Sequence, residues 1–307
     1  MAQVHKKTPA TQRPMTAMER QHLRNGLLFC LPGIVGLIMF TVYPVLASLY
    51  YSFCNYSVLK PPHWVGLGNY QVLMHDSQLG AALKNTVIYA AMAIPSGILT
   101  AFLLANLLNQ KVRGMAFFRT AFYLPSVTPA VASAVLWVWV LNPQFGLLNT
   151  ALASVGIQGP GWLSDPAWAK AALALMGMWG VGSWMVIFLA GLQDVPVELQ
   201  EAARLDGAGS YASWRHVTLP FMSPHLLFAS VMGLIGVSSF FAQPMVMTGG
   251  GPAGSTTFFA QYLFQNAFQF FKMGYACALA WSLAVVLIFL TALLFRGSTR
   301  YVYYGGD

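Results

Sequence analysis

Six long apolar stretches alternate with shorter polar connections along the 307-residue chain. A helix that crosses the hydrocarbon core of a bilayer needs about 20 mostly apolar residues, because each residue adds only about 1.5 Å. Windows of at least this length without Asp or Glu occur at residues 27–53, 81–108, 117–141, 168–193, 220–248 and 274–296. We therefore expect six transmembrane helices, the first of them uncleaved, since its apolar run is longer than the core of a secretory signal.

Several of these windows contain proline, and the prolines inside them include Pro44, Pro95, Pro125, Pro129 and Pro244. Proline has no N–H to donate and its ring clashes with the preceding turn of a helix. The carbonyl groups that it frees must find other partners or water. We expect kinked or interrupted helices at these positions.

The polar stretch VELQEAARLDGAGSYASWRHVTLP, residues 197–220, separates the fourth window from the fifth. Asp194 is placed to cap a helix that begins near Pro196, and Gly207 is placed to end it, because glycine adopts the left-handed conformation without strain. Gly209 permits a second tight turn, and Ser210 is placed to cap another short helix. The pattern predicts a helix, a sharp turn and a second helix.

One face of the first helix carries Leu199, Ala202, Ala203 and Asp206 at spacings of three and four residues. Two alanines on one face allow another surface to approach closely. The face therefore suits docking of a partner. An ordinary amphipathic loop at the membrane interface is the alternative interpretation, and helical spacing does not separate the two.

Composition and charge agree with a membrane protein. The chain is 57% hydrophobic and 8% charged, too apolar for one soluble core. Its net charge of +8 does not form a basic stripe interleaved with aromatic residues, so nucleic acid is not indicated. The two termini and the second and fourth connections hold 12 of the 16 Lys and Arg residues. Because cytoplasmic connections collect these residues, we expect both termini and the 197–220 stretch in the cytoplasm.

No catalytic, metal or cofactor site is predicted in this chain. The six His residues are scattered, and Cys30, Cys54 and Cys277 are far apart. The GGGP stretch at 249–252 is not followed by Lys and Ser or Thr, so it does not predict a nucleotide-binding loop. The six windows hold no carboxylate to carry a proton, which disfavours an ion-coupled secondary transporter, although a sodium site of backbone carbonyls stays open.

Aromatic and small polar residues lie midway along the windows. Rings stack on the apolar face of a sugar and hydroxyls bond its hydroxyl groups, so this combination suits a neutral sugar. The alternative is that such residues mark bilayer interfaces or bond to their own helix. The candidate substrate-path residues are Tyr123, Ser126, Trp179, Ser183, Trp184, Ser239, Phe240 and Gln243.

The sequence E-A-A at 201–203, followed by Gly207 and by Leu219-Pro220, resembles the cytoplasmic signature of ABC importer permeases. Further stretches resemble the carbohydrate-uptake branch, of the maltose and glycerol-3-phosphate permease type. They are GLGNY at 66–70, ALKNTVIY at 82–89, FRTAFYLPSVTPAVASAVLWVWVLNPQFGLLN at 118–149, DGAG at 206–209 and TGGGP at 248–252. The resemblance extends from about residue 25 to residue 297.

The resemblance implies an all-α integral membrane protein with the type I ABC importer permease fold and cytoplasmic coupling helices. Residues 1–25 and 298–307 would then be cytoplasmic tails, and residues 26–297 the six-helix permease domain with its coupling segment at 194–220. Contacts to an ATPase subunit would come from Leu199, Glu201, Ala202, Ala203, Asp206, Gly207 and Gly209.

The partners that the resemblance implies are a second, similar permease, two ATPase subunits that bind ATP and Mg²⁺, and an extracytoplasmic solute-binding protein. The implied location is the bacterial cytoplasmic (inner) membrane. The implied substrate is a sugar, and the neutral windows favour an oligosaccharide. Import of a solute similar to glycerol phosphate is the alternative within the same type.

Overall fold

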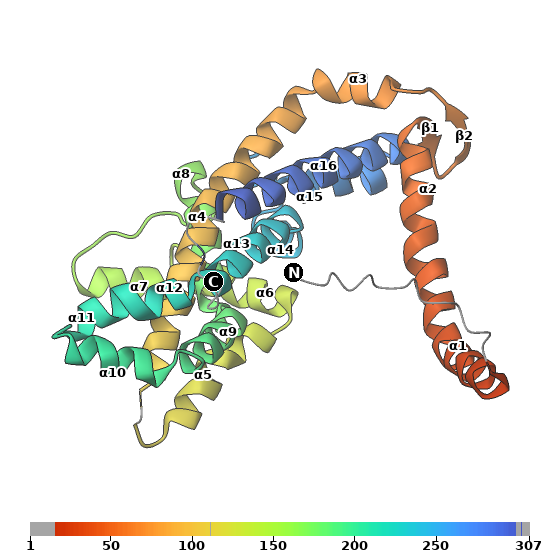
Figure 1. Ribbon diagram of the computed structural model, residues 1–307. Coiled ribbons are helices and arrows are strands. Elements are labelled where there is room, and N and C mark those ends of the chain that lie inside the picture. The colour runs from red at the N-terminus through yellow and green to blue at the C-terminus, as the bar shows by residue number, and fades with distance from the viewer. Residues whose placement is uncertain (1–15, 111, 299–301, 303–307) are drawn as a thin grey trace.

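In a computed structural model, described here for residues 16–110, 112–298 and 302, the chain is mostly helical (Figure 1). The first three elements, α1 (Ala17–Leu37), a π-turn (Ile38–Val42) and α2 (Tyr43–Ser52), form one helix of 36 residues. Thr16 and Glu19 form a capping box at its start. The helix thus begins ten residues before the expected span, inside the segment expected to be a cytoplasmic tail. Residues 1–15 of that segment lie outside the described residues.

The expected kink at Pro44 takes the form of the π-turn that directly precedes it. A π-turn widens the backbone ladder and accommodates a residue that cannot donate a hydrogen bond. No residue of α1 is buried. In Figure 1, α1 and the adjoining part of α2 stand apart from the other helices.

A hairpin and a short helix connect α2 to the next span. The antiparallel strands β1 (Cys54–Ser57) and β2 (Lys60–Trp64) pair Cys54 with Trp64, and α3 (Gly68–Met74) follows. The side-chain amide of Asn69 donates to the backbone carbonyls of Ser52 and Cys54, at 2.8 and 2.9 Å. These bonds hold the hairpin against α3.

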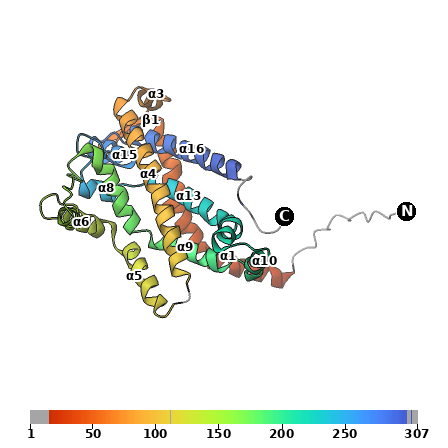
Figure 2. The same ribbon diagram turned by 90° about the vertical axis from the view of Figure 1, so that its left-hand side faces the viewer.

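The central helix is α4 (Ser77–Leu108), a single helix of 32 residues. It runs through Pro95 without the interruption expected there. Figures 1 and 2 show it passing between the helices that follow it in the chain. It packs against α8, α9, α13 and α15, whose bounds are given below.

The remaining helices are shorter because the chain bends between them. Their bounds are α5 (Met115–Val127), α6 (Ala130–Val140), α7 (Leu147–Ser154), α8 (Pro166–Trp179), α9 (Gly182–Gln193), α10 (Val197–Leu205), α11 (Ser210–Ser213), α12 (Leu219–Phe221), α13 (Ser223–Ser238), α14 (Ala242–Met247), α15 (Phe259–Phe264) and α16 (Met273–Ser298). Two more π-turns, Trp214–Thr218 and Gln265–Gln269, join α11 to α12 and extend α15.

The six expected spans correspond to three single helices and three bent pairs. The single helices are 17–52, 77–108 and 273–298, and the pairs are α5 with α6, α8 with α9, and the helix Ser210–Phe221 with α13. The pairs bend by 101°, 51° and 58°. The largest bend lies beside Pro125 and Pro129, where the expected break is confirmed (Figure 2).

The fifth span differs from the expected 220–248. The bent pair that forms it starts within the polar segment, at Ser210, and ends at Ser238. After it, α14 is a separate helix that contains Pro244. The hydroxyls of Ser238 and Ser239 donate to carbonyls of their own last turn. Such bonds compete with the backbone ladder and favour a helix end at this point.

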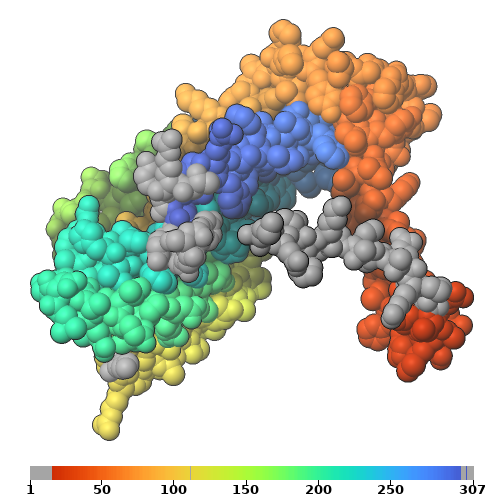
Figure 3. All heavy atoms as spheres, in the orientation of Figure 1, coloured from red at the N-terminus to blue at the C-terminus, as the bar shows by residue number. Residues whose placement is uncertain are grey.

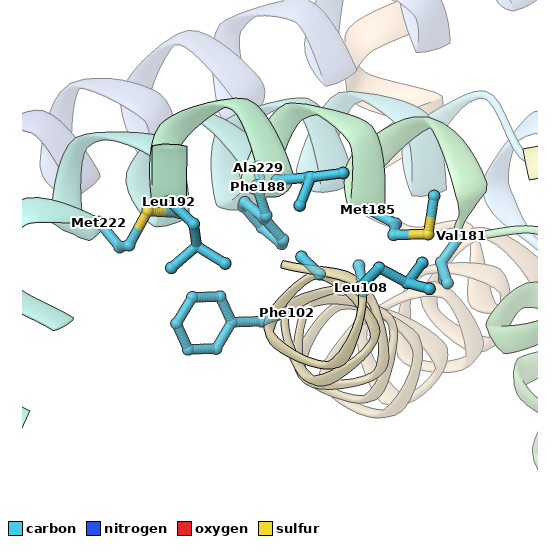
Figure 4. Packing of buried hydrophobic residues seen from close by; sticks show 11 residues of the cluster. Phe102, Leu108, Val181, Met185, Phe188, Leu192, Met222 and Ala229 are labelled. Carbon is cyan, nitrogen blue, oxygen red and sulfur yellow. The ribbon is translucent and has the colours of Figure 1, made fainter. Parts of the chain in front are cut away.

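The largest core joins α4, α9 and α13. Figure 4 shows their side chains meeting, with Phe102 of α4 close to Phe188 of α9. These two rings are perpendicular, with centroids 5.8 Å apart. Because this core lies next to the polar segment, it fixes where that segment stands.

Candidate functional site

The polar segment forms the predicted helix, turn and helix. Its first helix, α10, begins after Pro196, which is its N-cap residue. Asp194 does not cap it, contrary to expectation: it is the C-cap residue of α9, and its N–H donates to the carbonyl of Ala190 at 3.1 Å. Val195 and Pro196 lie between Asp194 and the first residue of α10.

The turn after α10 depends on Gly207, as predicted. Gly207 has φ of +82°, in the left-handed region. Its N–H donates to the carbonyl of Arg204, and the N–H of Ala208 donates to that of Ala203, at 3.0 and 2.9 Å. This pair of bonds is a Schellman motif, which satisfies the last carbonyls of a helix.

The second helix runs from Ser210 to Phe221. Its N-cap residue is Gly209, not Ser210 as expected, because the extended backbone lies at Gly209, with ψ of 167°. Gly209 has φ of −67°, so it does not need the left-handed freedom of glycine. Figure 3 shows both helices on the surface at one edge of the molecule.

A cleft of about 420 Å³ lies between these two helices. The four residues predicted to share a face all line it, and the second helix contributes the opposite wall. The lining residues are Leu199, Ala202, Ala203, Asp206, His216, Val217, Pro220 and Phe221. The shared face is confirmed, whereas Glu201 is exposed outside the cleft.

A second cavity, which we call the inner cavity, has a volume of about 330 Å³ and lies among α4, α5, α8, α9 and α13. It brings together three of the eight candidate path residues, Ser126, Ser183 and Trp184. Gly97 and Gly233 leave room for the indole, since a Cβ on Gly233 would lie 3.0 Å from the ring. The lining holds no charged side chain.

The other five candidate path residues do not line this cavity. Phe240 stacks on Tyr89, with centroids 4.8 Å apart and planes at 11°, and belongs to a core. The hydroxyl of Ser239 donates to its own helix. The remaining three, Tyr123, Trp179 and Gln243, lie on exposed or half-buried parts of α5, α8 and α14.

A cluster of Asp76, Tyr262 and Tyr275, at the end of α4 away from the docking cleft, was not predicted. Asp76 caps α4 by accepting from the N–H groups of Gln78 and Leu79, and its other oxygen accepts from the hydroxyls of Tyr262 and Tyr275, both at 2.5 Å. Burial raises the pKa of Asp76, but these hydrogen bonds outweigh burial and hold the pKa below its ordinary value. The cluster ties α4 to α15 and α16. No spacing rule joins residues almost 200 positions apart.

A second unpredicted contact ties the polar segment to α4. The indole N–H of Trp214 donates to the side-chain oxygen of Asn106 at 3.0 Å. The sequence feature that could have indicated this contact is Asn106 itself, a polar residue near the end of the apolar window 81–108. Among the described residues, no group of three or more His, Cys, Asp or Glu side chains is placed to hold a metal ion.

Comparison with known proteins agrees with this architecture. Residues 79–301 match the family described as binding-protein-dependent transport system inner membrane component. The chain is 37% identical to the probable ABC transporter permease YesP of Bacillus subtilis, with 91% of the chain and 92% of the relative covered. It is 33% identical to the lactose transport system permease LacF of Rhizobium radiobacter, with 91% and 96% covered.

A solved structure shows the same fold. A bacterial ABC transporter involved in the import of the acidic polysaccharide alginate contains a chain with a TM-score of 0.80 and 23% identity. The alignment covers 94% of the present chain and all of that one. Together, the family match, the relatives and the shared fold identify this chain as a member of the inner-membrane permease components of binding-protein-dependent ABC transport systems.

Proposed function

We propose that this chain is one permease subunit of an ATP-driven importer for a neutral sugar. The observation that carries the proposal is the cleft between α10 and the helix Ser210–Phe221, whose wall is the predicted docking face. A surface cleft lined by two alanines and an aliphatic side chain can accept a side chain or a helix from another protein. That other protein is an ATPase subunit, which supplies the nucleotide site.

A second permease chain is the partner within the membrane. The 36-residue first helix is apolar, and its most hydropathic window has no buried residue in the single chain. Its exposed face is available to another helix bundle as well as to lipid. The inner cavity then becomes one half of a path that the second chain completes. The distribution of basic residues supports a cytoplasmic location for both termini and the cleft.

The chemistry of the inner cavity supports a neutral sugar. Its polar groups are the Ser126 and Ser183 hydroxyls and the indole of Trp184. The Ser183 hydroxyl and the Trp184 indole can donate neutral hydrogen bonds, and the indole offers a ring for stacking. The Ser126 hydroxyl donates to the carbonyl of Tyr123 in its own helix at 2.7 Å, so it can only accept from a sugar. A phosphorylated solute needs a cation that the lining lacks. Relatives named for lactose, multiple-sugar and starch-product transport support the same substrate class.

Import then follows from movement of the docked segment, which consists of α10 and the helix Ser210–Phe221. Closure of the ATPase pair on ATP displaces α10, and the two bundles tilt between outward and inward access. The permease binds the sugar weakly and transmits force, and a binding protein outside the membrane delivers the sugar.

The test is reconstitution. The chain is expressed with its chromosomal neighbours, purified through a tag on itself, and assayed in liposomes for ATP hydrolysis with the candidate binding protein and a panel of oligosaccharides. We expect an ATPase to co-purify and one sugar-loaded binding protein to stimulate hydrolysis. A chain that purifies alone and moves solute only with an ion gradient would replace the proposal by a secondary transporter.

A further inference from the structure

The helix Ser210–Phe221 meets α13 at an angle of 58°. Two prolines explain the bend, because Pro220 and Pro224 both lack the N–H that would continue the backbone ladder. The hydroxyl of Ser223 donates at 2.5 Å to the carbonyl of Pro220, for which Pro224 supplies no N–H. The chain therefore bends at Met222, between the docking cleft and the membrane helices, and we call this bend the Met222 hinge.

A hinge by itself transmits force poorly. A push on α10 can rotate the helix Ser210–Phe221 about Met222 and leave α13 where it is. Transmission to the bundle needs a second attachment, on the docking side of the hinge. The structure has one at Trp214.

Trp214 connects the helix Ser210–Phe221 to α4. Its indole N–H donates to the side-chain oxygen of Asn106, and the amide of Asn106 donates to the carbonyl of Phe102 at 2.7 Å. The rings of Trp214 and Phe102 also contact, with centroids 6.0 Å apart. Two polar groups and two rings thus fasten the docking side of the hinge to the last turns of α4.

The end of α4 is itself fastened to the rest of the bundle. The guanidinium of Arg119, on α5, donates from two nitrogens to the carbonyl of Leu108, at 3.3 and 2.9 Å. Phe102 packs on Phe188 of α9 in the core of Figure 4. Both α4 and α5 continue to the inner cavity, which α4 lines with Ala93, Ile94 and Gly97 and α5 with Ser126.

We propose that the bond from Trp214 to Asn106 is the tether that transmits displacement of the docked segment across the Met222 hinge to α4, and so to the cavity. This inference rests on the proposed function and assigns two positioning residues within it. Neither residue contacts the cavity or lines the docking cleft. Their effect is on the coupling of ATP hydrolysis, not on assembly.

The experiment measures ATP hydrolysis by the reconstituted complex, with and without the sugar-loaded binding protein that stimulates the wild type. Trp214→Phe keeps a ring beside Phe102 but removes the N–H, and Asn106→Leu removes the acceptor. We expect either change to reduce the stimulation by the binding protein about fivefold, the factor that corresponds to one lost hydrogen bond of about 1 kcal/mol. The double variant should lose no more than Asn106→Leu, because the bond from the indole is already absent in that variant.

Two further variants separate the tether from a loss of stability. Asn106→Asp keeps an acceptor for the indole and loses only the donation to the carbonyl of Phe102, so stimulation should be largely retained. Trp162→Phe is the matched control, because the indole of Trp162 donates to the side chain of Asn149 at 2.6 Å in the connection between α6 and α8. It removes the same kind of bond far from the hinge and should keep stimulation at saturating binding protein.

The outcomes are distinguishable from failure of the proposed function. Normal stimulation in Trp214→Phe, or additive losses in the double variant, would overturn the tether while leaving the importer intact. Equal loss in Trp162→Phe would also overturn it, since the effect would then be general. Absence of a co-purified ATPase in the wild type would overturn the proposed function and the tether together.

Discussion

Removal of the Tyr275 hydroxyl, which bonds to Asp76, tests how the helices are held together at the end of the bundle away from the docking cleft. Tyr275 is buried on α16, and its hydroxyl donates to the carboxylate of Asp76 at 2.5 Å. A hydrogen bond to a charged group contributes about 1.5–3 kcal/mol to the free energy of unfolding. Tyr275→Phe keeps the ring and loses this bond, so we expect the free energy of unfolding to fall by about 2 kcal/mol and the melting temperature to fall by about 4 °C.

The assay is thermal unfolding of the detergent-purified complex, followed by loss of the monodisperse peak. Tyr70→Phe is the matched control, since its hydroxyl donates to the neutral hydroxyl of Ser52 at 2.9 Å. A neutral bond contributes about half as much as a charged one, so the control should lower the melting temperature by about 2 °C. Equal shifts in the two variants would refute the argument that the charge of Asp76 strengthens its bonds.

The same cluster predicts how the stability of the fold depends on pH. The hydrogen bonds outweigh burial and depress the pKa of Asp76 in the folded chain. A depressed carboxyl pKa stabilises the fold above the unfolded value of about 3.9, and this stability is lost as pH falls further, through the folded pKa. The destabilisation caused by Asp76→Asn should therefore be constant from pH 8 to pH 5 and shrink only below about pH 4. A change centred near pH 6 would assign the effect to another group.

Three other substitutions test the turn, the helix contacts and the cavity. Gly207→Pro should leave the protein in the membrane and abolish transport, because proline cannot adopt the φ of +82° found there, and normal uptake would contradict the role of the turn. Gly182→Ala should cost about 1–3 kcal/mol in thermal unfolding, since its Cβ would lie 2.7 Å from the carbonyl oxygen of Phe122, while Gly180→Ala, with its nearest atom at 3.6 Å, should cost much less. Trp184→Ala should lower sugar uptake several-fold while the ATPase still co-purifies, and unchanged uptake would place the path elsewhere.

Local pattern predicted the parts of the structure that depend on nearby residues. The spacing of Leu199, Ala202, Ala203 and Asp206 was sufficient to place them on one wall of the cleft, because helical periodicity alone decides which residues share a face. The left-handed turn at Gly207 followed from the chemistry of glycine. Both features need no knowledge of the rest of the chain.

Features that depend on distant partners were not predictable in this way. Phe240 looked like a path residue, yet it stacks on Tyr89, which lies 151 positions earlier in the sequence. Ser239 has the right chemistry for a sugar but bonds to its own helix. The tether residues Asn106 and Trp214 lie 108 positions apart, and neither has a distinguishing motif. Three-dimensional packing decides all of these cases.

The length of α4 has a consequence for the surrounding lipid. At about 1.5 Å per residue, its 32 residues measure about 48 Å, longer than the hydrocarbon core of about 30 Å. A rod of this length must tilt or emerge on both sides of the bilayer. Its two ends, at Asp76 and Asn106, are then anchored in the aqueous layers while its middle lines the cavity. A thicker membrane covers more of the rod and changes its tilt, so acyl-chain length becomes a variable that acts on transport through the same helix.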